Sequence, residues 1–197
     1  FRRALELEPD NEEALIGLPD AYIRAEELGA AEAAARKAVE RLPQSPEAVL
    51  TLGLVLGVRG ASQEAERVLR RAMELAPDDA RPPFRLAELL VTEGRNLQEA
   101  VELADRSAEI DAAEGMPAAL AAVALRKLGR DADALERLHT AALNYPRNTR
   151  LWLMMAAIYR DQGNERAAAE ATSYALRFAP RRPTGQEADD AGPTPSE

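Results

Sequence analysis

Residues 149–180 read TRLWLMMAAIYRDQGNERAAAEATSYALRFAP, and this stretch decides the fold. Large and small residues follow one another at helical spacing from Trp152 to Tyr159. Gly163 interrupts the pattern, and an alanine-rich stretch then runs to Pro180. Proline cannot donate the helical hydrogen bond, so it ends this second stretch. The segment therefore predicts two helices joined by a short turn.

The same unit recurs along the chain with a period of 34 residues. Similar segments end in prolines, at Pro9, Pro43, Pro77, Pro146 and Pro180. Ala112 takes the place of the missing proline, and the period implies one inserted residue near Asn96–Leu97. Small residues stand twelve places before these positions, at Ala31, Ala65, Ala100, Ala134 and Ala168. Helix pairs that repeat in this way stack on their neighbours, which predicts an all-α solenoid.

This pattern resembles the tetratricopeptide repeat, a helix–turn–helix unit of 34 residues. The last repeat matches the family's positions with Trp152, Met155, Ala156, Tyr159, Gly163, Ala168, Ala175 and Pro180. The resemblance implies a right-handed solenoid. Residues 1–11 would be the end of a truncated preceding repeat, and five repeats would follow at 12–45, 46–79, 80–114, 115–148 and 149–180.

The repeat frame also predicts where each helix lies. First helices are expected at about 12–25, 46–59, 80–93, 115–128 and 149–162, and second helices at about 29–41, 63–75, 98–110, 132–144 and 166–178. Pro19 falls inside a first helix, so we expect a bend or break there, because an interior proline costs about 3 kcal/mol. Residues 181–197 are acidic and rich in proline and glycine, which predicts a disordered tail.

The composition excludes several classes of chemistry. The chain has 197 residues, no cysteine, one histidine and a formal charge of −9. A histidine-based catalytic triad or a metal site with two histidines cannot form, and we expect His139 to be an ordinary structural residue. No glycine-rich phosphate loop, basic block or membrane-spanning apolar run occurs, so we expect no catalytic residues, no cofactor, no metal, no nucleic-acid partner and no membrane insertion.

The family resemblance implies that first helices line a concave groove in which protein partners dock. We expect either a peptide or an amphipathic helix as the partner. The candidate binding residues are Ile16, Leu50, Leu54, Arg81, Phe84, Arg85, Ala119, Val123, Arg150 and Leu153. Another interpretation stays open at this point, because the same apolar residues could pack between adjacent helices.

Two functions fit these features. The first is a non-catalytic scaffold or adaptor that holds a protein segment within a larger assembly. The alternative is the C-terminal regulatory or substrate-presenting part of a multidomain enzyme, because the sequence begins inside a second helix at Phe1. The excess of arginine over lysine suggests a bacterial source, and both the cytoplasm and the periplasm are compatible with the sequence.

Overall fold

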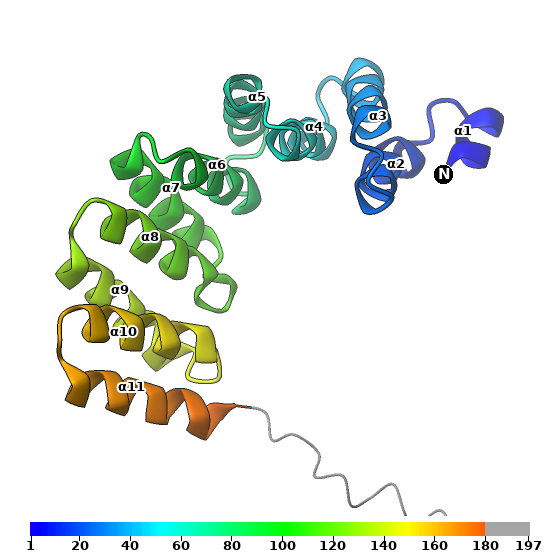
Figure 1. Ribbon diagram of the computed structural model, residues 1–197. Helices are drawn as coiled ribbons and strands as arrows, with labels where there is room; N and C mark the ends of the chain where they lie inside the picture. Colours follow the sequence, from blue (N-terminus) through cyan, green and yellow to red (C-terminus); the bar gives the residue numbers. More distant parts are fainter. Residues whose placement is uncertain (180–197) are drawn as a thin grey trace, which may run out of the picture.

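The computed structural model describes residues 1–179, which form eleven α-helices and one 3₁₀ turn, without any strand in this range (Figure 1). In chain order these are α1 Arg2–Leu7, α2 Glu12–Arg24, α3 Leu28–Arg41, α4 Pro46–Val58, α5 Ser62–Leu75, α6 Arg81–Glu93, α7 Leu97–Ile110, the 3₁₀ turn Ala113–Gly115, α8 Met116–Lys127, α9 Asp131–Asn144, α10 Thr149–Asp161 and α11 Glu165–Phe178. The tail expected at 181–197 lies outside the described residues.

The all-α fold predicted from the repeat is confirmed. From α2 to α11, each helix begins and ends within one residue of its expected position. Local chemistry explains several of these starts. The side chains of Asn11, Ser45 and Asn164 accept hydrogen bonds from backbone N–H groups in the first helical turn. Pro46 and Pro117 lie in first turns, where the missing N–H has no helical partner to lose.

Helix α2 corrects one expectation. It runs without interruption from Glu12 to Arg24 with Pro19 inside it, so the predicted break is wrong. Pro19 is fully buried, and α2 packs against both α3 and α4. We infer that this packing outweighs the cost of about 3 kcal/mol that an interior proline imposes on an isolated helix.

The helix pairs stack into an arc (Figure 1). The even-numbered helices α2 to α10 are the first helices of the pairs, and the odd-numbered helices α3 to α11 are the second helices. Successive first helices touch one another from α2 to α8, whereas successive second helices approach less closely within residues 1–179 and meet through long side chains. The first helices therefore line the shorter, concave side of the arc.

The small residues of the repeat allow this close packing. The alanines at 31, 65, 100, 134 and 168 are all buried in the contacts between helices. Leu56, Leu90 and Leu125 occupy equivalent places in successive first helices and are also fully buried. One core cluster thus passes from α4 to α11, and two smaller clusters lie toward the N-terminal end, as expected when each unit buries its apolar face against its neighbour.

Each turn between a first and a second helix contains one residue with a left-handed backbone conformation at the same place in the repeat. Glycine supplies it in four turns, with φ between +67° and +77°, at Gly60, Gly94, Gly129 and Gly163. In the turn after Gly94, one extra residue precedes α7, and Asn96 adopts a left-handed conformation with φ of +48°. The first turn differs, because Glu26 holds the left-handed position with φ of +60°.

We expect Glu26→Gly to raise the free energy of unfolding by about 0.5–1 kcal/mol, because a side chain strains a left-handed residue. Urea denaturation followed by circular dichroism measures the change. Glu26→Ala is the matched control, since it removes the carboxylate but keeps the Cβ atom. Equal stabilisation by both substitutions would show that charge, and not backbone conformation, is responsible.

Candidate functional site

The N-terminal half of α6 forms the centre of the concave surface. Pro82 and Pro83 are buried in its first turn. Helical spacing then places Arg81, Phe84 and Arg85 on one face. Phe84 is half-buried and lies with Met116 and Pro117 of α8 around a hollow of about 160 Å³, which Arg81 and Arg85 also line.

A second hollow lies between α4 and α6. Its volume is about 340 Å³, and Leu54 and Val58 of α4 face Arg85 and Leu89 of α6 across it. Gly57 leaves space on the α4 side, because nothing lies within 4 Å of where its Cβ would be. Arg85 lines both hollows, so they form one groove that extends over α4, α6 and α8. We call this the concave groove.

Arg81 bridges two first helices. Its guanidinium makes two hydrogen bonds to the Glu47 carboxylate on α4, at 2.6 and 3.1 Å, and it also pairs with Asp79 at 2.7 Å. The hydrogen bond from Arg81 holds the pKa of Asp79 below its usual value. Two carboxylates therefore neutralise Arg81, and its role at the groove is to hold α6 against α4.

Arg85 has a different environment. Its Cζ atom lies 5.6 Å from the centroid of the Phe84 ring, and its Nη1 atom donates to the Glu88 carboxylate at 3.0 Å. Both partners belong to the same helix, so Arg85 makes no bridge to another first helix among residues 1–179. Together, Phe84 and Arg85 present an aromatic ring with a cation beside it, an arrangement suited to contact with another protein.

The structure separates the other predicted residues by burial. Leu50 and Ala119 are only 3% and 6% exposed, so they form the core beneath the groove and do not reach a partner directly. Val123 is half-buried against the same core. Ile16 packs beside Leu15 in a separate cluster at the N-terminal end. For Leu50 and Ala119, this burial favours the packing interpretation.

Helix α10 continues the concave side with an exposed apolar and basic face. Leu153 is 51% exposed, and Arg150 and Arg160 flank it at helical spacing. Neither arginine makes an ion pair within the described part of the chain, whereas Arg126 on α8 is paired with Asp161 at 2.5 Å. The C-terminal part of the concave side therefore carries uncompensated positive charge.

Two exposed residues of the groove were not among the binding residues predicted from the sequence. Met116 is 51% exposed at the start of α8, and Val58 is similarly exposed at the end of α4. The signal was present, because Met116 holds the same place in its repeat as Arg81 and Arg150 in theirs. Val58 stands at the thirteenth place of its repeat, which also faces inward.

The stacked pairs and their concave groove define an α-solenoid of helix–turn–helix repeats. A model of the tetratricopeptide repeat family matches residues 1–46 and 50–117, more than half of the chain, so the protein belongs to this family. Such repeats are generally non-catalytic modules for protein–protein interaction. No curated protein matches the chain. Within residues 1–179, no group of three or more acidic or histidine side chains is placed to hold a metal ion, and no helix is long and apolar enough to span a membrane.

Solved structures share the fold at low sequence identity. MamA residues 41-end from Desulfovibrio magneticus RS-1 superpose with a TM-score of 0.72 at 14% identity, covering 85% of this chain and 94% of that one. YrrB, described as a TPR protein with an unusual peptide-binding site, gives 0.67 at 19% identity, covering 90% and 91%. PilF of Pseudomonas aeruginosa gives 0.74 at 17% identity, covering 87% and 78%.

Proposed function

We propose that the protein is a scaffold or adaptor that holds an acidic, partly apolar protein segment in its concave groove. The observation that carries this proposal is the exposed group at the centre of the groove, where Phe84, Met116 and Arg85 surround one hollow. Aromatic residues, methionine and arginine are enriched in protein interfaces. A peptide or an amphipathic helix with one large apolar side chain fits a hollow of this size.

Apolar side chains extend this surface on both sides of Phe84. Val58 and Leu54 lie toward the N-terminal end, and Leu153 lies on α10 toward the C-terminal end. Apolar side chains that lie along one side of a molecule among charged neighbours are typical of a surface that a partner covers. The fold of YrrB, whose described function includes a peptide-binding site, supports a peptide ligand as one form of partner.

The charges on α10, beyond the C-terminal end of the groove, favour an acidic partner, whereas Glu88, Glu93 and Asp111 line the two hollows of the groove itself. Arg150 and Arg160 have no ion-pair partner among residues 1–179, and Arg85 is paired only within its own helix. Carboxylates on the bound segment would pair with these arginines, and the match of opposite charges would speed association. Arg81 takes no part in this attraction, because Glu47 and Asp79 already neutralise it.

Phe84→Ala is expected to weaken binding of the partner segment by about 2 kcal/mol, or roughly thirtyfold, chiefly through faster dissociation. A photoreactive benzoylphenylalanine in place of Phe84 identifies the segment by cross-linking and mass spectrometry. Calorimetric titration of the corresponding synthetic peptide then gives the affinity for the wild-type protein and for Phe84→Ala.

The same titration tests the charge of the groove. Arg85→Glu should weaken binding at low salt and have less effect at high salt, because exposed charges are screened over about 8–10 Å near physiological ionic strength. Arg67→Glu is the control, since Arg67 is exposed on the convex helix α5 and makes no ion pair in the described residues. The proposal fails if Arg67→Glu abolishes binding while Phe84→Ala and Arg85→Glu bind like the wild type.

A further inference from the structure

The convex side of the arc contains four seams, which we define as the lines where successive second helices face each other. An ion pair crosses each of the first three seams. Arg36 of α3 binds Glu64 of α5 at 2.8 Å, and Arg70 of α5 binds Glu99 of α7 at 2.7 Å. In the third seam, Arg137 of α9 pairs with Asp105 of α7. Each of these three seams is therefore bridged by an ion pair between an arginine guanidinium and a carboxylate.

The fourth seam, between α9 and α11, lacks this bridge in the described residues. His139 stands at the place of Arg70 and Asp105, counted by the repeat period. Ala167 and Ala171 stand where the partner side chains would be. Neither alanine can form an ion pair, so no ion pair crosses this seam within residues 1–179.

A second kind of bridge is also replaced there. Arg71 and Arg106 reach back across the first and second seams and donate to the backbone carbonyls of Pro43 and Pro77. Thr140 holds the equivalent place in the third seam, and Tyr174 holds it in the fourth.

In the fourth seam, aromatic residues occupy the region around the corresponding carbonyl, that of Pro146. Trp152 Nε1 donates to the carbonyl of Pro146 at 3.0 Å. The ring of Tyr174 stacks on Trp152, with centroids 4.7 Å apart and planes 20° from parallel. Aromatic rings therefore line this seam, whereas arginine ion pairs cross the first three.

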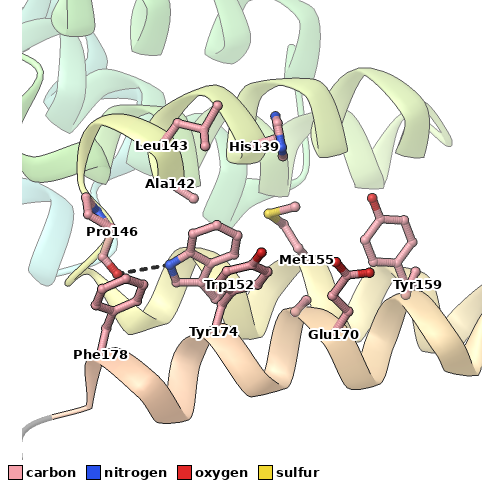
Figure 2. Close-up of a pocket in the computed structure, with 12 residues that line it drawn as sticks. His139, Ala142, Leu143, Pro146, Trp152, Met155, Tyr159, Glu170, Tyr174 and Phe178 are labelled. Carbon is pink, nitrogen blue, oxygen red and sulfur yellow. Dashed lines mark hydrogen bonds between the residues drawn. The ribbon is translucent and has the colours of Figure 1, made fainter.

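These changes leave an open cleft, which we call the aromatic cleft (Figure 2). Its volume is about 400 Å³, and its lining comes from α9, α10 and α11. Trp152, Tyr174 and Phe178 lie toward one end, and Glu170 extends beside Met155 and Tyr159 toward the other (Figure 2). Tyr174 is 37% exposed, so its ring is accessible to a ligand.

Glu170 is the charged group that distinguishes the cleft chemically. It projects from α11 into the lining and has no cationic partner among residues 1–179. In the other three seams, an arginine pairs with one carboxylate across the seam, at Glu64, Glu99 and Asp105. An arginine from outside would supply the missing cation. Its planar guanidinium can also stack on an aromatic ring while it binds a carboxylate.

We infer that the aromatic cleft is a second protein-binding site, which takes a segment carrying an arginine next to an apolar residue. The arginine pairs with Glu170, and the apolar neighbour lies against Tyr174 and Phe178, above the buried ring of Trp152. The site lies on the opposite face from the concave groove, and its preferred charge is also opposite. The inference does not depend on the groove, and it gives the protein two surfaces with different partner chemistry.

Trp152 provides a direct measurement, because it is the chain's single tryptophan and lines the cleft. The probe is the synthetic peptide acetyl-GALRPAG-amide, and acetyl-GALEPAG-amide is its charge-reversed counterpart. Titration of the full chain with the arginine peptide should change Trp152 emission in a saturable way. The glutamate peptide should cause no saturable change. Equal responses to the two peptides would overturn the inference.

Substitutions in the cleft make the test specific. Glu170→Gln should weaken binding of the arginine peptide at least about tenfold, in line with a hydrogen bond to a charged group. Glu136→Gln is the matched control, because Glu136 holds the same place one repeat earlier on α9. It should leave the affinity unchanged, and an equal loss from both substitutions would contradict a role for the cleft.

A rebuilt seam provides an independent variant. His139→Arg combined with Ala167→Glu recreates the arrangement of Arg70 and Glu99 and closes the cleft with an internal ion pair. This double variant should keep the wild-type melting temperature and lose peptide binding. A folded double variant that binds the peptide with wild-type affinity would refute the inference.

Other occupants of the cleft would give different results. A second copy of the chain would appear as self-association in sedimentation velocity that Tyr174→Ala abolishes. The chain's own residues 180–197 would appear as a change in Trp152 emission on their deletion, with no response of the full chain to the arginine peptide. Either result would overturn the assignment of an external arginine-bearing segment.

Discussion

Trp152→Ala is expected to lower the free energy of unfolding by about 3–5 kcal/mol, the usual cost of removing a buried tryptophan ring. Trp152 is only 5% exposed and lies among α9, α10 and α11. The substitution removes the stack on Tyr174 and leaves the carbonyl of Pro146 without its N–H donor. Because repeats contact only their neighbours, the loss should be concentrated in α9 to α11.

Urea denaturation gives the total loss, and hydrogen exchange read by mass spectrometry gives its location. Trp152→Phe is the control, since it keeps a ring in the core and loses the indole N–H, at an expected cost of about 1 kcal/mol for the hydrogen bond. Faster exchange spread evenly over α2 to α11 would contradict the local effect. A total loss below that of Trp152→Phe would contradict the role of ring packing.

Gly115→Ala is expected to lower the free energy of unfolding by about 2–4 kcal/mol, because backbone strain and overpacking add at one position. Gly115 precedes α8 with φ of +86°. A Cβ atom there would lie 2.9 Å from Leu151 Cδ1 and 3.4 Å from the Cβ of Ala141. Leu151 is fully buried on α10, so its side chain would have to shift within the core.

Gly129→Ala separates the two contributions. Gly129 has φ of +73°, but nothing lies within 4 Å of its would-be Cβ atom. Gly129→Ala should therefore lower the free energy of unfolding only through backbone strain, by about 1–2 kcal/mol. The difference between the two variants in chemical denaturation measures the steric part. Equal losses at both positions would show that the contact with Leu151 costs nothing.

The fold was predictable because it depends on features that repeat. The closing prolines, the small residues such as Ala65 and Ala168, and the turn glycines recur at one period, so each repeat corroborates the others. The prediction at Pro19 was wrong. Helix propensity argued for a break, but burial against α3 and α4 decided the outcome, and a local rule does not include that packing.

The groove was predictable only in outline. Counting places in the repeat identified which residues face inward, but Leu50 is buried and Leu54 is partly exposed, because exposure depends on the size of neighbouring side chains. Arg81 has the position of a binding residue, yet Glu47 neutralises it from the preceding first helix. Counting places in the repeat would also have identified the exposed Met116, which was not predicted.

The aromatic cleft needed a different comparison. Tyr174 and His139 are unremarkable within their own helices, and their meaning appears only when each is compared with Arg106 and Asp105 one or two repeats earlier. The sequence contains this information. The partners across each seam come from another repeat, however, and the structure was required to show which places face each other.

The contrast between the seams shows that one surface of a repeat array can differ from the others independently. In a globular core, exchanging bridging arginines for rings would disturb most of the packing at once. Here the fourth seam differs while the ion pairs of the first three remain, since contacts extend only to adjacent units. A few substitutions at fixed places in one unit therefore suffice to change one surface, while the contacts of the other units stay the same.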